Sequence, residues 1–68
     1  MQHLSTFYKE NATSKHRAEV VNNEGVYQIH YYNINGELFK TESFEGKAQN
    51  YVEDAAENWT TDIKVLNG

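Results

Sequence analysis

Two glycine-ended turn motifs, Asn22-Asn23-Glu24-Gly25 and Asn33-Ile34-Asn35-Gly36, constrain the fold of this chain more than any other feature. Glycine adopts the left-handed backbone conformation that tight turns require without a steric penalty. Each motif lies between runs rich in β-branched and aromatic residues, which is the pattern of a β-hairpin. The sequence therefore predicts an antiparallel meander of three strands, at about residues 17–21, 26–32 and 37–43.

The second motif also predicts a register. Asn-x-Asn-Gly suits a type I turn followed by a glycine bulge, which sets Asn33 opposite Glu37. A two-residue Asn35-Gly36 turn would change the face on which Tyr32 lies. Counting back from the first arrangement predicts three cross-strand pairs: Tyr31 with Phe39, Ile29 with Thr41, and Tyr27 with Ser43. Side chains alternate along a strand, so a first loop of two or four residues gives this core face: Ala18, Val20, Tyr27, Ile29, Tyr31 and Phe39.

A helix is predicted at residues 46–60 because apolar residues recur there at helical spacing, at Ala48, Tyr51, Val52, Ala55 and Trp59. A helix of this kind covers the apolar face of a small sheet. Tyr51, Val52, Ala55 and Trp59 are expected to complete the core. The fold class is therefore α+β, a three-stranded antiparallel β-meander packed against one C-terminal α-helix.

The remaining segments are less patterned. In the N-terminal segment 1–16, Leu4, Phe7 and Tyr8 suit either a fourth strand or a clasp across the sheet, and residues 11–15 suggest a loop. In the tail, residues 61–68, an apolar group is expected to fold back on the core: Ile63, Val65 and Leu66. The 68 residues are expected to form a single small domain.

Composition restricts the functions that this chain can have. It contains no cysteine, so disulfides and thiolate metal sites are excluded. With a core this small, we expect stability to come from idealised packing, from a partner or from a homodimer. No signal peptide and no apolar run long enough to span a bilayer are present, so a soluble, intracellular protein is expected.

The sequence carries no recognisable catalytic pattern. Its histidines, His3, His16 and His30, lie in three separate segments without the spacing of a metal site. Glu53 and Glu57 are one helical turn apart, but such pairs are common on solvated helix faces. We therefore expect no enzyme activity, no catalytic residue, no metal and no cofactor.

Two surfaces are candidates for binding a protein partner. The predicted open face of the sheet carries an apolar strip with a polar rim, as protein interfaces do: Val21, Tyr32 and Leu38 bordered by His30, Lys40, Glu19 and Glu42. The N-terminal segment would cover this strip if it formed a clasp. The second surface is the acidic side of the helix, which suits a basic patch on a partner or is simply solvated: Asn50, Glu53, Asp54 and Glu57, with Glu45 and Asp62 at its ends.

Nucleic-acid binding is the alternative function. A three-stranded sheet with one helix resembles the plan of the plant ethylene-response DNA-binding domain and of phage integrase arm-binding domains. Residues 44–48, followed by Tyr51 and Ala55-Ala56, also resemble the helix of the former. The net charge of −4, and one Lys and one Arg against two Glu on the open face, oppose contact with phosphates.

Three segments carry a family resemblance: HRAEVV at 16–21, VYQIHYYNINGEL at 26–38 and YVEDAAENWT at 51–60. Together, over residues 16–63, they resemble small uncharacterised proteins of marine T4-like phages that infect cyanobacteria. The resemblance implies expression in the cytoplasm of an infected bacterial cell and brings no catalytic residue. It favours an accessory protein that binds and modulates a bacterial host protein. A self-associating structural protein is a further alternative.

Overall fold

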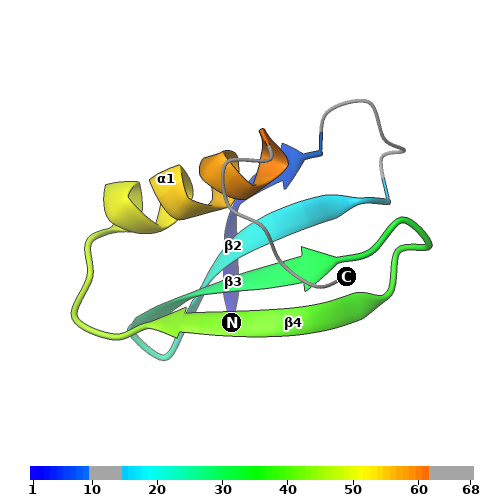
Figure 1. Cartoon of the computed structure of the whole chain (residues 1–68). Helices are drawn as coiled ribbons and strands as arrows, with labels where there is room; N and C mark the ends of the chain where they lie inside the picture. The colour runs from blue at the N-terminus through cyan, green and yellow to red at the C-terminus, as the bar shows by residue number, and fades with distance from the viewer. Residues whose placement is uncertain (10–14, 62–68) are drawn as a thin grey trace.

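The computed structural model describes residues 1–9 and 15–61 and shows a four-stranded antiparallel sheet with one helix on one face (Figure 1). The strands lie in sequence order: β1 (Gln2–Tyr8), β2 (Arg17–Asn23), β3 (Val26–Tyr32) and β4 (Leu38–Phe44). The helix α1 spans Gln49–Thr60. The predicted α+β class is confirmed, with the N-terminal segment supplying the fourth strand.

The first hairpin turns in two residues. Asn23 pairs with Val26, which leaves Glu24 and Gly25 as the turn, with φ angles of 54° and 87°. Positive φ at both central positions defines a type I′ turn, whose twist matches that of the strands. The Gly25 N–H donates to Asn22 Oδ1 at 2.9 Å. This loop length places Ala18 and Val20 on the same face as Ile29 and Tyr31, as expected.

The second hairpin has the predicted turn. The Asn33 N–H donates to the Glu37 carbonyl at 2.8 Å, and the Gly36 N–H donates to the Asn33 carbonyl at 2.9 Å. Asn33 Oδ1 accepts from the N–H groups of Asn35 and Glu37, at 2.9 and 3.0 Å. Gly36 has a φ of +84°. Asn33 therefore lies opposite Glu37, and the two-residue Asn35-Gly36 alternative is wrong.

The register predicted beyond this turn is wrong by one residue. Tyr32 pairs with Leu38, but a β-bulge follows, and Tyr31 then pairs with Lys40. The predicted partners Phe39, Thr41 and Ser43 are thereby replaced by Lys40, Glu42 and Phe44. A bulge inserts one extra residue into one strand, so the later side chains of β4 change face. Lys40 and Glu42 accordingly lie on the helix side of the sheet.

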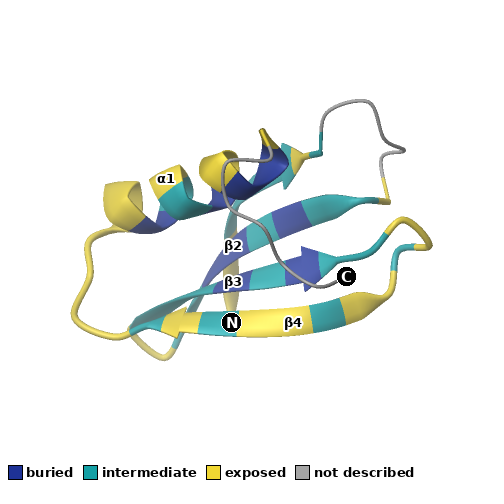
Figure 2. Cartoon of the chain, viewed as in Figure 1, coloured by how far each residue is buried: buried dark blue, intermediate teal, exposed yellow. Residues whose placement is uncertain are grey.

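The core lies between α1 and the central strands (Figure 2). Its buried residues are Ala18, Val20, Ile29, Tyr31, Val52, Ala56 and Trp59, with Leu4, Phe7, Tyr27, Phe39, Phe44 and Ala55 packed around them. In Figure 2 the buried colour follows β2, β3 and the sheet-facing side of α1, whereas β4 is exposed or half-buried.

The helix begins later and faces the sheet differently from the prediction. Gly46 has a φ of +79° and Ala48 is extended, so α1 starts at Gln49 rather than at residue 46. Its buried stripe contains Val52, Ala56, Trp59 and Thr60. Tyr51 was predicted in the core, but its exposed fraction is 53%. The helix ends at Thr60, as expected.

The N-terminal segment extends the sheet instead of crossing its open face. β1 pairs antiparallel with β2, with Phe7 opposite Ala18 and Ser5 opposite Val20. A bulge between His3 and Ser5 accompanies the packing of Leu4 on the core. The clasp alternative is therefore wrong for the described strand. The predicted loop centre and the predicted fold-back of Ile63, Val65 and Leu66 lie outside the described residues.

Candidate functional site

The face of the sheet opposite α1 carries side chains from all four strands in transverse rows. The pairing between strands defines three such rows, because paired residues share a face. From one end of the sheet they are Tyr8–Arg17–Tyr32–Leu38, then Thr6–Glu19–His30–Thr41, then His3–Val21–Gln28–Ser43. The first row is called the aromatic–arginine row below.

The aromatic–arginine row combines exposure with a fixed cation. Tyr8 and Leu38, at its two ends, have exposed fractions of 57% and 53%. Between them the Arg17 guanidinium carbon lies 4.0 Å from the centroid of the Tyr32 ring. This is a cation–π distance. The row therefore offers apolar area at both ends and a stacked cation near its centre.

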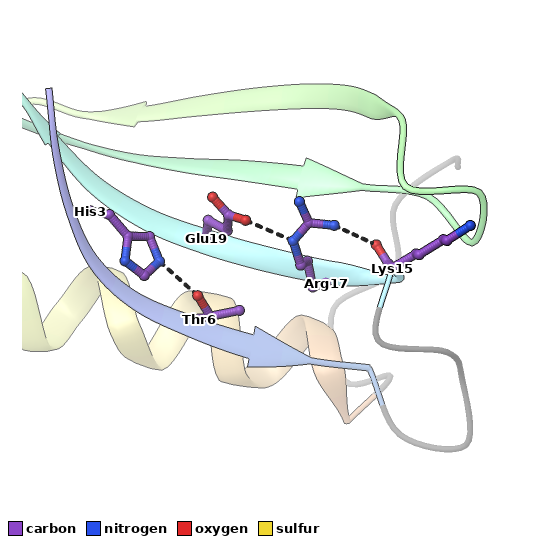
Figure 3. A network of polar contacts seen from close by, with 5 residues as sticks. All are labelled: His3, Thr6, Lys15, Arg17 and Glu19. Carbon is purple, nitrogen blue, oxygen red and sulfur yellow. Dashed lines mark hydrogen bonds and ion pairs between the residues drawn. The ribbon is translucent and has the colours of Figure 1, made fainter.

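Two polar contacts hold Arg17 in place. Its Nε donates to Glu19 Oε2 at 2.7 Å, and its Nη1 donates to the Lys15 carbonyl at 3.0 Å. Figure 3 shows Arg17 between these two residues, with the His3–Thr6 contact farther along the same face. An arginine restrained in this way loses less rotamer entropy when a partner binds.

The other two rows are mainly polar and bonded among themselves. Gln28 Nε2 donates to Ser43 Oγ at 3.2 Å, and Gln28 Oε1 lies 3.2 Å from His30 Nε2. His3 Nε2 and Thr6 Oγ1 are 2.7 Å apart. These contacts leave the aromatic–arginine row as the main apolar feature of the open face.

Only some of the residues predicted to form the open-face surface lie on that face. His30, Tyr32 and Leu38 lie on this face, and so does Val21, but Val21 is only 4% exposed. Lys40 lies on the opposite side, because the bulge in β4 pairs it with Tyr31. Sequence reasoning missed Tyr8 as a member of this surface. The signal for it was the alternation of β1, whose pairing partner was not assigned.

The acidic side of α1 forms a separate surface. Asn50, Asp54 and Glu57 are exposed, whereas Glu53 is half-buried and turned towards β1. Ser5 Oγ donates to Glu53 Oε2 at 2.6 Å, and Gln49 Nε2 donates to the same oxygen at 3.1 Å. These hydrogen bonds, that of Ser5 foremost, lower the pKa of Glu53 below its usual value. This surface and the aromatic–arginine row lie on opposite sides of the sheet, so one flat partner surface cannot touch both.

The histidine and acidic side chains are spread over the described part of the fold. Across residues 1–9 and 15–61, no three His, Cys, Asp or Glu side chains gather as a metal site would require. The three histidines stay apart, with His16 packed edge-on against Trp59 at 5.3 Å between ring centroids. No helix in this part of the chain is long and apolar enough to cross a membrane.

No protein-family model, curated protein or solved structure gives a significant match to this chain. The fold and its exposed surfaces define the chain as a small α+β domain with an open sheet face. Any function assigned to it therefore depends on the arrangement of its own residues.

Proposed function

We propose that this chain is a small acidic, non-catalytic protein-binding module that docks its partner on the open face of the sheet. The observation that supports this most directly is the stacking of Arg17 on Tyr32 between two exposed apolar side chains, Tyr8 and Leu38. Tyrosine and arginine are enriched among the residues that contribute most of the binding energy of protein interfaces.

The resemblance of residues 16–63 to proteins of cyanobacterial T4-like phages supports a setting for this function. In that setting the partner is a bacterial host protein, and the chain acts in the cytoplasm of an infected cell as a phage accessory protein. Binding at the open face would then modulate the host protein by covering part of its surface.

Charge argues for a protein partner over a nucleic acid. Stacking platforms for single strands also combine aromatic rings with arginine, but they lie in positively charged grooves. Here the net charge is −4, and Glu19 lies 2.7 Å from Arg17 in the candidate surface itself. A phosphate approaching Arg17 would meet this carboxylate.

The experiment that tests the proposal is a capture of binding partners from a cyanobacterial lysate with the tagged full chain. Half of the lysate is treated with nuclease. The variants are Tyr8→Ala and Leu38→Glu, at the exposed ends of the aromatic–arginine row. Tyr51→Ala is a matched control, because Tyr51 is as exposed as Leu38 but belongs to the helix. A fourth variant, Glu57→Lys, alters the acidic side of α1.

We expect one protein to be captured with and without nuclease, and to be lost with Tyr8→Ala and Leu38→Glu but kept with Tyr51→Ala. Titration of that purified protein should show binding weakened at least about tenfold by each open-face variant. Loss of the capture with nuclease would assign the open face to nucleic acid instead. Loss of the captured protein with Glu57→Lys alone would assign the binding surface to the acidic side of α1.

A further inference from the structure

Strand β4 forms one edge of the sheet. Among the described residues it pairs with β3 on one side, and in Figure 1 its other side faces away from the rest of the sheet. The backbone N–H and C=O groups on such an edge are a template for pairing with another strand. The side chains of β4 therefore decide which strand this edge accepts.

The charges of β4 lie close together and on one face. Lys40 and Glu42 pair with Tyr31 and Ile29, which places both on the helix side of the sheet. Thr41 lies between them on the open face and is the middle residue of the strand. Glu42 Oε1 also accepts a hydrogen bond from the Tyr31 hydroxyl at 2.9 Å, which holds this carboxylate on the helix side.

We infer that β4 pairs with β4 of a second copy of this chain, antiparallel and centred on Thr41. A two-fold axis that relates two antiparallel edge strands runs perpendicular to the sheet and passes midway between them, so that one residue of each strand lies directly opposite its own copy. Centring on Lys40 or on Glu42 would place two like charges directly opposite each other, which is unfavourable. Centring on Thr41 places Lys40 opposite the partner's Glu42, and Glu42 opposite the partner's Lys40.

Overlap selects the same register. Thr41 is the midpoint of Leu38–Phe44, so centring there aligns the two strands along their full length. Centring on Ser43 or Phe44 shortens the overlap and pairs neither charge with an opposite one. Lys40 and Glu42 also disfavour the registers in which either residue faces its own copy. Charged side chains on edge strands commonly restrict unwanted pairing in this way. Charge complementarity and length therefore agree on one arrangement.

The paired sheet would contain the four strands of each copy, with both helices on one side and both open faces on the other. Each copy would then keep its own aromatic–arginine row exposed. The pairing is thus independent of the proposed function, and a variant such as Tyr8→Ala should leave it intact.

The test is sedimentation equilibrium of the full chain at several concentrations and low ionic strength. The wild type should form dimers, and Lys40→Glu and Glu42→Lys should each weaken them at least about tenfold, because either change creates two like-charge pairs. A 1:1 mixture of these two variants should dimerise again, since each charge then faces an opposite charge on the other variant. Lys47→Glu, with the same change of charge outside β4, is the control and should dimerise like the wild type.

Circular dichroism of each variant establishes that it is folded before its mass is interpreted. The mixing experiment is valid even if neither variant has wild-type stability, because it compares each variant alone with the same two variants together. A wild type that stays monomeric at every concentration would overturn the inference. So would a dimer that both variants leave unchanged, or a mixture that stays monomeric.

Discussion

Trp59 packs edge-on against Tyr31, with their ring centroids 5.2 Å apart and their planes at 66°. Both side chains are almost completely buried, and Phe39 approaches the same indole with its ring centroid at 6.4 Å. Lys9 lies above the indole at 4.6 Å and donates from Nζ to the Trp59 carbonyl at 2.8 Å. The Trp59 side chain and the Lys9 hydrogen bond therefore both hold the C-terminal end of α1 against the rest of the fold.

Replacing Trp59 by alanine should cost about 3–5 kcal/mol of unfolding free energy, as for other buried large aromatic side chains. Such a loss would leave a chain of this size mostly unfolded. Denaturant unfolding followed by circular dichroism measures it. Tyr51→Ala is the control, because the Tyr51 side chain is 53% exposed and should change stability by less than about 1 kcal/mol. A Trp59→Ala variant with the wild-type midpoint would refute the central role of this residue.

The stability of the fold should decline in alkali because of Tyr31. Burial, together with the hydrogen bond to Glu42 and its negative charge, raises the pKa of Tyr31 above the usual tyrosine range. In the unfolded chain tyrosine ionises near pH 10, at about its reference value. The contribution of Tyr31 to the unfolding free energy is therefore fully present below about pH 10, and it is lost as pH rises from there towards the folded-state pKa.

Tyr31→Phe should remove this part of the pH dependence. The variant should lose about 1 kcal/mol at neutral pH, where the hydrogen bond to Glu42 is missing, and should fall less steeply than the wild type above about pH 10. Thermal midpoints between pH 7 and pH 11 measure both effects. Tyr8→Phe, at an exposed position, is the matched control. An alkaline decline equally steep in Tyr31→Phe and wild type would show that other groups cause it.

The two hairpins and the buried tryptophan could be predicted from sequence, because glycine turns and helical spacing are local signals. The bulge in β4 was not predicted because it depends on the packing of β4 against the core and not on a local sequence signal. Phe39 and Phe44 are five positions apart, so a regular strand would place them on opposite faces of the sheet. One inserted residue lets both pack against the core. Two large aromatic residues of opposite parity in one edge strand were the available signal.

The binding surface was predictable only in part, for a related reason. Val21 was expected to be exposed because β1 had not been assigned to the sheet edge. In the structure Val21 has His3 beside it on β1 and Gln28 beside it on β3, and it is buried. The same strand adds Tyr8 to the aromatic–arginine row. Composition alone does not indicate whether a terminal segment will pair with an edge strand of the sheet, or with which one.

The first hairpin contains a strained residue that can be improved. Glu24 is the described non-glycine residue with a positive φ, at 54°, and the side chain of a non-glycine residue is unfavourable there. Asparagine tolerates this conformation better and is the preferred first residue of a type I′ turn. Glu24→Asn should therefore raise the unfolding free energy by about 0.5–1 kcal/mol, a part of the penalty for an ordinary side chain at positive φ. Gly25→Ala, at a φ of 87°, should lower it by about 1 kcal/mol or more, and the reverse order of these two stabilities would exclude the turn type.

The contact between Ser5 and Glu53 should make the fold sensitive to acid. The folded-state pKa of Glu53 lies below the usual value because Ser5 and Gln49 donate to its carboxylate. A lowered folded-state pKa stabilises the fold above the unfolded value of about 4.3, and this contribution is lost as pH falls through the folded-state pKa. Removing the hydroxyl in Ser5→Ala should raise the pKa of Glu53 and make the fall in stability between pH 7 and pH 3 smaller.

Glu53→Gln should also reduce this acid-dependent fall, whereas Glu57→Gln, on the exposed side of the same helix, should preserve it. Carboxyl carbon chemical shifts followed by NMR through the titration report the Glu53 pKa directly, and thermal midpoints at the two pH values report its effect on folding. A Glu53 pKa that is the same in Ser5→Ala and wild type would mean that the hydroxyl does not bond the carboxylate in solution. In that case β1 would be held to α1 by the packing of Leu4 and Phe7 rather than by this hydrogen bond.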